Sequence, residues 1–411
     1  MDASTQTSPD AQVERETLRR YAELIVGLGA NVQPWQVAEV RATLEQRALV
    51  HEIVAAAYRR GARFVDVNWF DPYVRRSRIE LADASTLDFV PSWHRERVRQ
   101  LGEQRCARIS LSPSNPPGLY EDLDPGAVAL EPFPFLPDYM RLIDDNTTNW
   151  VGVACPTAAW AQQVHPQLEP DEALRKLWDE VLHACRLDEA DPVAAWQERF
   201  DALARAEGAL NEHRFDALHF EGPGTDFTLG LMPTSRWESG VSATVDGIVF
   251  AANLPTEETF TAPDPQRADG VVRATKPLQL KGGTLVDGLT VRFEAGRAVS
   301  VEADSGAEAM RSMLETHENA DRLGEVALVD GNGRIGPLGT VFYNTLYDEN
   351  AASHLALGSA YLDTVGEEDR DRVNRSPIHV DFMIGGDEVD VTGITRGSER
   401  VPVLRRGAWQ I

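Results

Sequence analysis

The sequence has few cysteines and no long apolar run. Cys106, Cys155 and Cys185 are its only cysteines and form no CxxC pair, so neither a disulfide framework nor a cysteine-based zinc site is indicated. No apolar stretch reaches the roughly 20 residues of a membrane-spanning helix, and the polar N-terminus lacks the apolar segment of a signal peptide. We expect the first dozen residues to be disordered. These features predict a cytoplasmic protein with no membrane partner.

Positive charge is also scarce. The 411 residues include 40 Lys and Arg against 65 Asp and Glu, which gives a net charge of −25. Such an acidic chain is a poor match for nucleic acid or an anionic membrane. The hydrophobic content of 42% is that of a globular protein, and the length predicts two or three domains.

Several familiar catalytic motifs are absent. There is no GxSxG elbow and no HExxH helix motif, which disfavours the common serine hydrolase and zinc peptidase designs. GPGTD (222–226) lacks the lysine of a phosphate-binding loop, so it predicts a tight turn before a strand.

The two halves of the chain show different patterns. The first half alternates expected helices with expected strands, which predicts a mainly parallel sheet. The expected helices are 13–28, 48–62, 171–186 and 191–210, and the expected strands are 37–44, 63–70, 106–113 and 150–156.

The second half consists of short alternating runs separated by Gly, Asn and Asp turns, which predicts an antiparallel sheet. We therefore expect an α/β N-terminal domain (1–210) with a mainly parallel sheet, followed by an α+β C-terminal catalytic domain (211–411) with an antiparallel sheet.

His379 and Asp381 are separated by one residue in IHVDFMI. In a strand these side chains share one face, and Val380 and Phe382 share the other. A histidine and a carboxylate side by side on an apolar strand form either a two-point metal site or a metal-free hydrogen-bonded pair.

The segment ASHLALGSAY predicts a helix, which would bring His354 and Tyr361 close to one face. Both residues also fit simple core positions. Glu349 precedes the segment, where its charge would complement the start of the expected helix.

Two further segments offer carboxylates. Glu257 and Glu258 are adjacent in PTEETFTAP, which taken alone favours an exposed turn or helix start; if a strand continues there, only one of them faces inward. Glu325 opens the apolar run LGEVALVD, as either an edge charge or an inward ligand.

Taken together, these residues supply four carboxylates and two imidazoles, which are Glu258, Glu325, Glu349, His354, His379 and Asp381. One divalent cation would leave the carboxylates under-compensated, whereas two would roughly neutralise them. Paired metals about 3.5–4 Å apart commonly activate water for attack on a carbonyl or phosphoryl centre.

At these residues the chain resembles the thermophilic aminopeptidase family, which includes the aminopeptidase T, aminopeptidase S and PepS metallopeptidases. The segments that carry the resemblance run over nearly the whole chain. They are LHFEGPGTDFTLGL, NLPTEETFTAP, LGEVALVD, LYDENAASHLALGSAY, IHVDFMIGGDEVDVTG and VPVLRRGAWQI.

The resemblance implies a dinuclear metallo-aminopeptidase that acts on peptides with a free N-terminus. It implies zinc, cobalt or manganese as the two divalent ions and a homodimer as the assembly. The implied metal ligands are Glu258, Glu325, His354, His379 and Asp381, with Glu349 at a further metal-site position.

The resemblance also implies a mechanism. The metals would activate a water and polarise the scissile carbonyl, and Tyr361 would stabilise the oxyanion. Glu325 or Glu349 would move the proton to the leaving amine. Two alternatives stay open: a dinuclear hydrolase of another amide or a phosphoester, and a catalytically silent metal-binding scaffold.

Overall fold

The computed structural model describes residues 15–113, 115–133, 138–280 and 284–411; the N-terminal residues expected to be disordered lie outside these ranges. The chain forms two compact units. The first unit runs through Trp196 and adds Val241–Pro255, and the second comprises Gln197–Gly240 and Thr256–Ile411. The domain boundary between residues 210 and 211 stays a prediction. None of the helices in the described ranges combines the length and apolar character that crossing a bilayer requires.

The first unit contains a five-stranded sheet in the order β10-β4-β3-β1-β2, and every neighbouring pair is parallel. The predicted parallel sheet is therefore confirmed. The edge strand β10 comes from the returning segment, far along the chain from the other four strands. The strands are β1 (Val37–Thr43), β2 (Phe64–Phe70), β3 (Ala107–Ser112), β4 (Trp150–Ala154) and β10 (Asn253–Leu254).

Helices connect the strands of the first unit, and the expected ones are present. They are α1 (Arg15–Leu24), α2 (Arg47–Arg59), α3 (Pro72–Leu81), α4 (Ser92–Glu103), α5 (Pro125–Leu130), α6 (Asp138–Asp144), α7 (Ala158–Val164) and α8 (Pro170–Ala184). The segment after α1, Ile25–Gly29, is a π-helix. A short hairpin pairs β8 (Ser242–Ala243) with β9 (Val249–Phe250).

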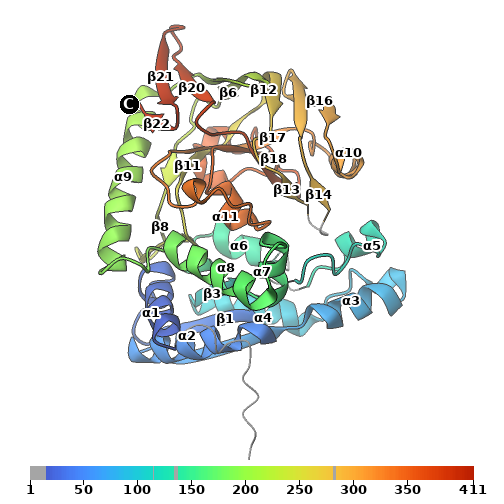
Figure 1. The fold of residues 1–411 in the computed structure, drawn as a ribbon, viewed down its shortest axis with the longest axis vertical. Coiled ribbons are helices and arrows are strands. Elements are labelled where there is room, and N and C mark those ends of the chain that lie inside the picture. Colours follow the sequence, from blue (N-terminus) through green and yellow to red (C-terminus); the bar gives the residue numbers. More distant parts are fainter. Residues whose placement is uncertain (1–14, 114, 134–137, 281–283) are drawn as a thin grey trace, which may run out of the picture. The chain divides into compact units, whose positions relative to one another are not determined.

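The long helix α9 (Pro192–His213) carries the chain from the first unit into the second (Figure 1). Its start is set by Asp191, whose Oδ1 accepts hydrogen bonds from the backbone N–H groups of Val193 and Ala194 at 3.1 and 3.0 Å. An aspartate at this position satisfies N–H groups that have no partner within the helix.

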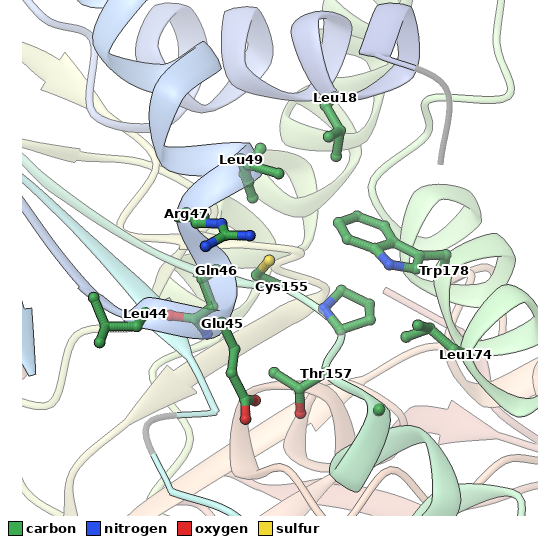
Figure 2. A pocket seen from close by; sticks show the side chains of 13 residues that line it. Leu18, Leu44, Glu45, Gln46, Arg47, Leu49, Cys155, Thr157, Leu174 and Trp178 are labelled. Carbon is green, nitrogen blue, oxygen red and sulfur yellow. The ribbon is translucent and has the colours of Figure 1, made fainter. Parts of the chain in front are cut away.

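A cavity of about 340 Å³ lies in the first unit, beside the segments that follow β1 and β4. Figure 2 shows its apolar wall, which includes Leu18, Leu49, Leu174 and Trp178, with Glu45 nearby. The carboxyl ends of parallel strands are a common place for clefts. None of the predicted site residues lines this cavity.

The second unit contains an eight-stranded antiparallel sheet in the order β16-β15-β12-β6-β5-β20-β21-β22. GPGTD forms the tight turn that joins β5 to β6, as predicted, with Gly222 paired to Thr225 and Gly224 at φ +77°. The strands are β5 (Ala217–Gly222), β6 (Thr225–Leu231), β12 (Pro263–Arg273), β15 (Thr290–Glu294), β16 (Arg297–Glu302), β20 (Asp390–Ile394), β21 (Arg400–Arg405) and β22 (Ala408–Trp409).

A second sheet of the same unit has five antiparallel strands in the order β19-β18-β17-β11-β7. The strands are β7 (Glu238–Ser239), β11 (Glu258–Thr261), β17 (Leu323–Val329), β18 (His354–Gly358) and β19 (His379–Met383). Helices α10 (Ala307–Thr316) and α11 (Thr345–Glu349) and a small ladder of β13 (Leu278–Gln279) and β14 (Leu285–Val286) complete the unit.

The predicted helix in ASHLALGSAY is wrong, because His354–Gly358 is strand β18. Alanine and leucine favour helix locally, but all five residues of this segment are buried between β17 and β19. Burial on both faces and two ladders of hydrogen bonds override the local preference. His354 and Tyr361 therefore do not share a helical face.

Strands β17, β18 and β19 of this sheet have two different faces. One face contributes large apolar side chains to the main hydrophobic core of the unit, among them Val326, Leu328, Leu355, Leu357 and Phe382. Because side chains alternate along a strand, the residues between these positions point to the opposite face. That face carries the predicted metal ligands.

Candidate metal centre

Five of the predicted ligands come from four strands of one sheet. Glu258 begins β11, Glu325 is the third residue of β17 and His354 begins β18, while His379 and Asp381 both lie on β19. Glu325 is 4% exposed on a fully buried strand, so it is an inward carboxylate and not an edge charge.

Small residues lie between the ligands on this face. Ala356 is the cross-strand partner of both Glu325 and Asp381. His354 pairs with Ala327, and His379 pairs with Gly358. Directly paired residues in an antiparallel sheet point to the same side, so these methyl groups and the glycine leave room for the longer side chains to converge.

The ligand atoms converge in two groups that share Glu325. Glu258, Glu325 and His354 form the first group, and Glu325, His379 and Asp381 form the second; within each group the ligand atoms lie within 4.8 Å of one another. In the first group His354 Nε2 lies 3.2 Å from Glu258 Oε2 and 3.7 Å from Glu325 Oε1.

In the second group His379 Nε2 lies 3.1 Å from Asp381 Oδ1 and 3.4 Å from Glu325 Oε2. His379 and Asp381 thus share one face of β19, as their spacing predicted. Glu325 directs one carboxylate oxygen toward each histidine, which is the arrangement expected of a carboxylate between two cations.

The histidine tautomers suit metal binding. Nδ1 of His354 lies 3.2 Å from the carbonyl oxygen of Ala352, and Nδ1 of His379 lies 2.9 Å from that of Ser359. A carbonyl oxygen only accepts, so Nδ1 carries the hydrogen and Nε2 of a neutral ring presents a lone pair to the carboxylates. A carbonyl behind a histidine is the usual support of a metal-ligating imidazole.

Two buried carboxylate oxygens in the cluster, Glu258 Oε2 and Asp381 Oδ1, form no hydrogen bond of regular geometry, and each faces the Nε2 atom of a histidine instead. Buried polar atoms are rarely left in this state. Carboxylate oxygens that converge in a buried space repel one another unless cations lie between them, so the donor set fits divalent metal ions.

Without a metal, the histidines can relieve the cluster only by taking up protons. Burial lowers the pKa of His354, but contacts with Glu258 and Glu325 raise it well above its ordinary value. Burial likewise lowers the pKa of His379, and the charge of Asp381 outweighs this and raises the pKa to about 9. Metal uptake must displace these protons.

Glu349 ends α11 and belongs to neither group of converging ligands. Burial, together with the nearby charges of Glu258 and Asp381, raises the pKa of Glu349 well above its ordinary value. A carboxyl group whose pKa lies well above its ordinary value is suited to proton transfer.

Tyr361 follows β18 and lies beside the ligands. Its ring centroid is 5.6 Å from those of Phe260 and His379. The residue is 38% exposed. Partial removal of its phenol from water, together with the charges of Glu325 and Glu349, raises the phenol pKa well above its ordinary value. The phenol therefore stays protonated and can donate a hydrogen bond.

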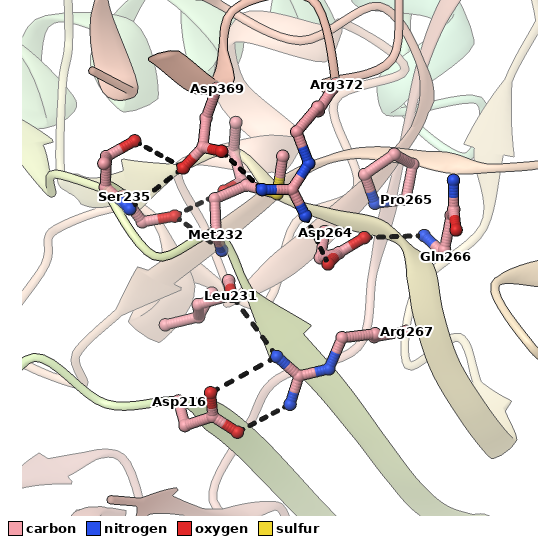
Figure 3. A network of polar contacts seen from close by, with 12 residues as sticks. Asp216, Leu231, Met232, Ser235, Asp264, Pro265, Gln266, Arg267, Asp369 and Arg372 are labelled. Atoms are coloured by element: carbon pink, nitrogen blue, oxygen red, sulfur yellow. Dashed lines mark hydrogen bonds and ion pairs between the residues drawn. The ribbon is translucent and has the colours of Figure 1, made fainter. Parts of the chain in front are cut away.

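The segment that connects β18 to β19 carries Tyr361 and is held in place at two points. Thr364 is fully buried; its Oγ1 donates to the carbonyl of Tyr361 at 2.7 Å and accepts from the N–H of Ala262 at 3.1 Å. Asp369 pairs with Arg372 at 2.5 Å (Figure 3) and accepts from Thr234 Oγ1 at 2.7 Å.

The exposed turn or helix start that PTEETFTAP favoured is wrong. Glu258 begins a strand, and Glu257 is fully buried on the other side of the chain, where it pairs with Arg199 of α9. The sequence alone does not identify Arg199 as a partner, because it lies 58 residues before Glu257. The adjacent Glu257 and Glu258 were a partial signal: in a strand only one of them can face the metal side, so the other needs a different partner, but the sequence does not say which residue supplies it.

Comparisons with known proteins show which family the chain matches. Residues 14–409 match the model of the family described as "Thermophilic metalloprotease (M29)". The chain is 42% identical over 406 residues to aminopeptidase T of Thermus thermophilus, covering 97% of this chain and 99% of the relative. It is 38% identical over 410 residues to aminopeptidase PepS of Streptococcus thermophilus, with 97% and 98% covered.

A solved structure titled "Wild-type AmpT from Thermus thermophilus" matches the fold with a TM-score of 0.90 and 40% identity, covering 97% of this chain and all of that one. Aminopeptidase AmpS of Bacillus subtilis is 37% identical over 405 residues, with 96% and 98% covered. The chain belongs to the M29 family of thermophilic metalloproteases.

Proposed function

We propose that this metal-dependent aminopeptidase holds two divalent ions, zinc, cobalt or manganese, and removes N-terminal residues from peptides. Glu258 and His354 would bind one ion, and His379 and Asp381 the other, with Glu325 contributing to both. The observation that carries the proposal is the shared position of Glu325, whose two oxygens face the two histidines.

When bound, the ions would supply a water of lowered pKa and polarisation of the scissile carbonyl. The protein contributes a protonated phenol at Tyr361, which donates a hydrogen bond to the oxyanion that develops at that carbonyl. In its ionised form, Glu349 would take up the proton of the attacking water and pass it to the leaving amine; Glu325 is the alternative for this role.

The homodimer and the cytoplasmic location are part of the same proposal. Large apolar side chains of the first unit are exposed, including Trp35, Leu81 and Trp93 at 81%, 79% and 69%. Surfaces of this kind are often covered by another protein chain. Light scattering coupled to size-exclusion chromatography measures the assembly directly.

Metal content per chain, determined by elemental analysis, tests the proposal together with activity on leucine-nitroanilide before and after chelation. We expect about two ions per chain, loss of activity on chelation, and recovery with zinc, cobalt or manganese. Absence of bound metal and of metal-restored activity would favour the silent-scaffold alternative.

The free N-terminus is tested with matched peptides. We expect release of amino acids from an unblocked peptide and none from the same peptide after N-acetylation. Cleavage of the acetylated peptide would instead favour a hydrolase of other amides.

A further inference from the structure

A buried arginine lies where two of the three strands that carry the first group of ligands meet, at the start of β11 and the end of β17. The Arg199 side chain is only 6% exposed, and its Nε forms a close ion pair with Glu257 Oε2 at 2.5 Å. Its Nη2 contacts Asp330 Oδ1 at 2.7 Å. Both carboxylates are also buried, at 0% and 3% side-chain exposure.

These contacts fix the backbone next to two metal ligands. Arg199 Nη2 donates to the main-chain carbonyl of Glu257 at 3.1 Å, which is the peptide bond that leads into Glu258. Asp330 directly follows β17, the strand of Glu325, and Glu258 is the cross-strand partner of Val329. One guanidinium therefore ties together β11 and β17 where these strands meet.

The same cluster reaches α11. The backbone N–H of Glu257 donates to Asn350 Oδ1 at 2.6 Å, and Asn350 Nδ2 donates to the carbonyl of Leu346 at 2.9 Å. Asn350 is fully buried and follows Glu349. The segment held by Arg199 is thus hydrogen-bonded to the helix that presents Glu349.

We propose that Arg199 is a positioning residue for the metal centre, holding Glu258 and Glu325 at the separation that the ions require. Its planar guanidinium contacts two carboxylates and a main-chain carbonyl at fixed angles, which a lysine ammonium reproduces only in part. The inference rests on the proposed ligand set.

The test measures the zinc affinity of Arg199→Met and Arg199→Lys by competition with a chromogenic chelator. We expect Arg199→Met to bind zinc about 10–100-fold more weakly, the usual effect of losing a residue that supports a ligand. Arg199→Lys is expected to recover part of that loss. Wild-type affinity in folded Arg199→Met would overturn the inference.

Arg75 provides a matched control in the first unit. Its Nε lies 2.7 Å from Glu131 Oε2 and its Nη2 donates to the main-chain carbonyl of Glu131 at 3.0 Å, the same pattern of contacts. We expect Arg75→Met to leave zinc affinity unchanged. An equal loss in both methionine variants would show that Arg199 acts only through general stability.

If Arg199→Met does not fold, the zinc affinity of Asp330→Asn serves as the test instead. This change keeps the side-chain volume and removes the charge that Arg199 Nη2 contacts. We expect a weaker zinc affinity in folded Asp330→Asn, and an unchanged affinity would overturn the inference.

Glu258→Gln separates this inference from the proposed function. If Glu258→Gln keeps full zinc affinity, the proposed ligand set is wrong. If Glu258→Gln weakens zinc binding and the Arg199 variants do not, only the role of Arg199 is wrong.

Discussion

The phenol of Tyr361 can contribute to catalysis without holding metal. Its ring packs against His379 and Phe260, and its hydroxyl stays protonated because its surroundings raise the pKa. These contacts put a neutral hydrogen-bond donor beside the ligands. The role assigned to it is therefore separable from metal binding.

We expect Tyr361→Phe to retain full metal content and to lose about 10²–10³-fold in kcat, the usual effect of removing one oxyanion donor. Elemental analysis and steady-state kinetics on leucine-nitroanilide measure the two quantities. Loss of metal in this variant would make Tyr361 a structural residue instead.

Glu238 on β7 predicts a dependence of stability on pH. Burial, reinforced by the charges of Asp363 and Glu207, raises its pKa from 4.5 to about 7. A carboxyl group with a raised folded-state pKa destabilises the fold once it ionises. Its contribution to stability is therefore full below pH 4.5 and is lost as the pH rises through 7.

We expect Glu238→Gln to be more stable than the wild type at pH 8, by up to about 3 kcal/mol for this shift. The difference should shrink toward zero near pH 4.5. Thermal unfolding at both pH values measures it, and an equal effect of the substitution at the two pH values would contradict the assignment.

At the scale of elements, strands β17, β18 and β19 combine a large apolar face with a face of small residues between ligands. Ala356 has Glu325 on one neighbouring strand and Asp381 on the other. A larger side chain at Ala356 would occupy the space into which these carboxylates converge.

We expect Ala356→Leu to bind metal at least 10-fold more weakly, since ligand spacing sets affinity. The matched change Leu357→Met alters the opposite, core-facing side and should leave metal affinity unchanged. Chelator competition on both variants checks this. Equal affinities in the two variants would show that the small residues are not needed.

Sequence patterns predicted strands and turns better than they predicted β18. The alternation around His379 and Asp381 is local, so it could be followed along one strand. The burial of His354–Gly358 depends on β17 and β19, which lie on either side of it in space. Some residue patterns fit both a helix and a buried strand. Which of the two forms depends on neighbouring strands, and the local sequence does not reveal those neighbours.

The same distinction applies to the site. The predicted ligands could be named because they fall in short motifs that resemble those of a known family. Arg199, Asp330 and Asn350 support those ligands through contacts between distant segments. No local pattern marks such residues, so only the three-dimensional arrangement identifies them.

At the scale of the whole molecule, the proposed metal centre links folding to metal supply. In the metal-free protein the carboxylates of the cluster repel one another, and bound ions would remove that repulsion. A ligand that binds only the folded state stabilises it by about 2.7 kcal/mol at one hundred times its Kd. The effect belongs to the second unit, which contains all the proposed ligands.

We therefore expect chelation to lower the unfolding temperature of the second unit and re-addition of zinc to restore it. Hydrogen exchange should show faster exchange on β11, β17, β18 and β19, with little change on β1 to β4. Differential scanning calorimetry provides the temperatures. An unfolding profile that is unchanged by chelation would argue against a metal that stabilises the fold.

The edge strand β10 has a consequence for the synthesis of the protein. Asn253–Leu254 pairs with β4, yet about 40 residues after Trp196 belong to the other unit. A ribosome must therefore translate past residue 254 before the parallel sheet can acquire its last strand. Until then the hydrogen-bonding groups along one side of β4 have no strand to pair with, so a nascent chain that pauses earlier exposes a template for aggregation.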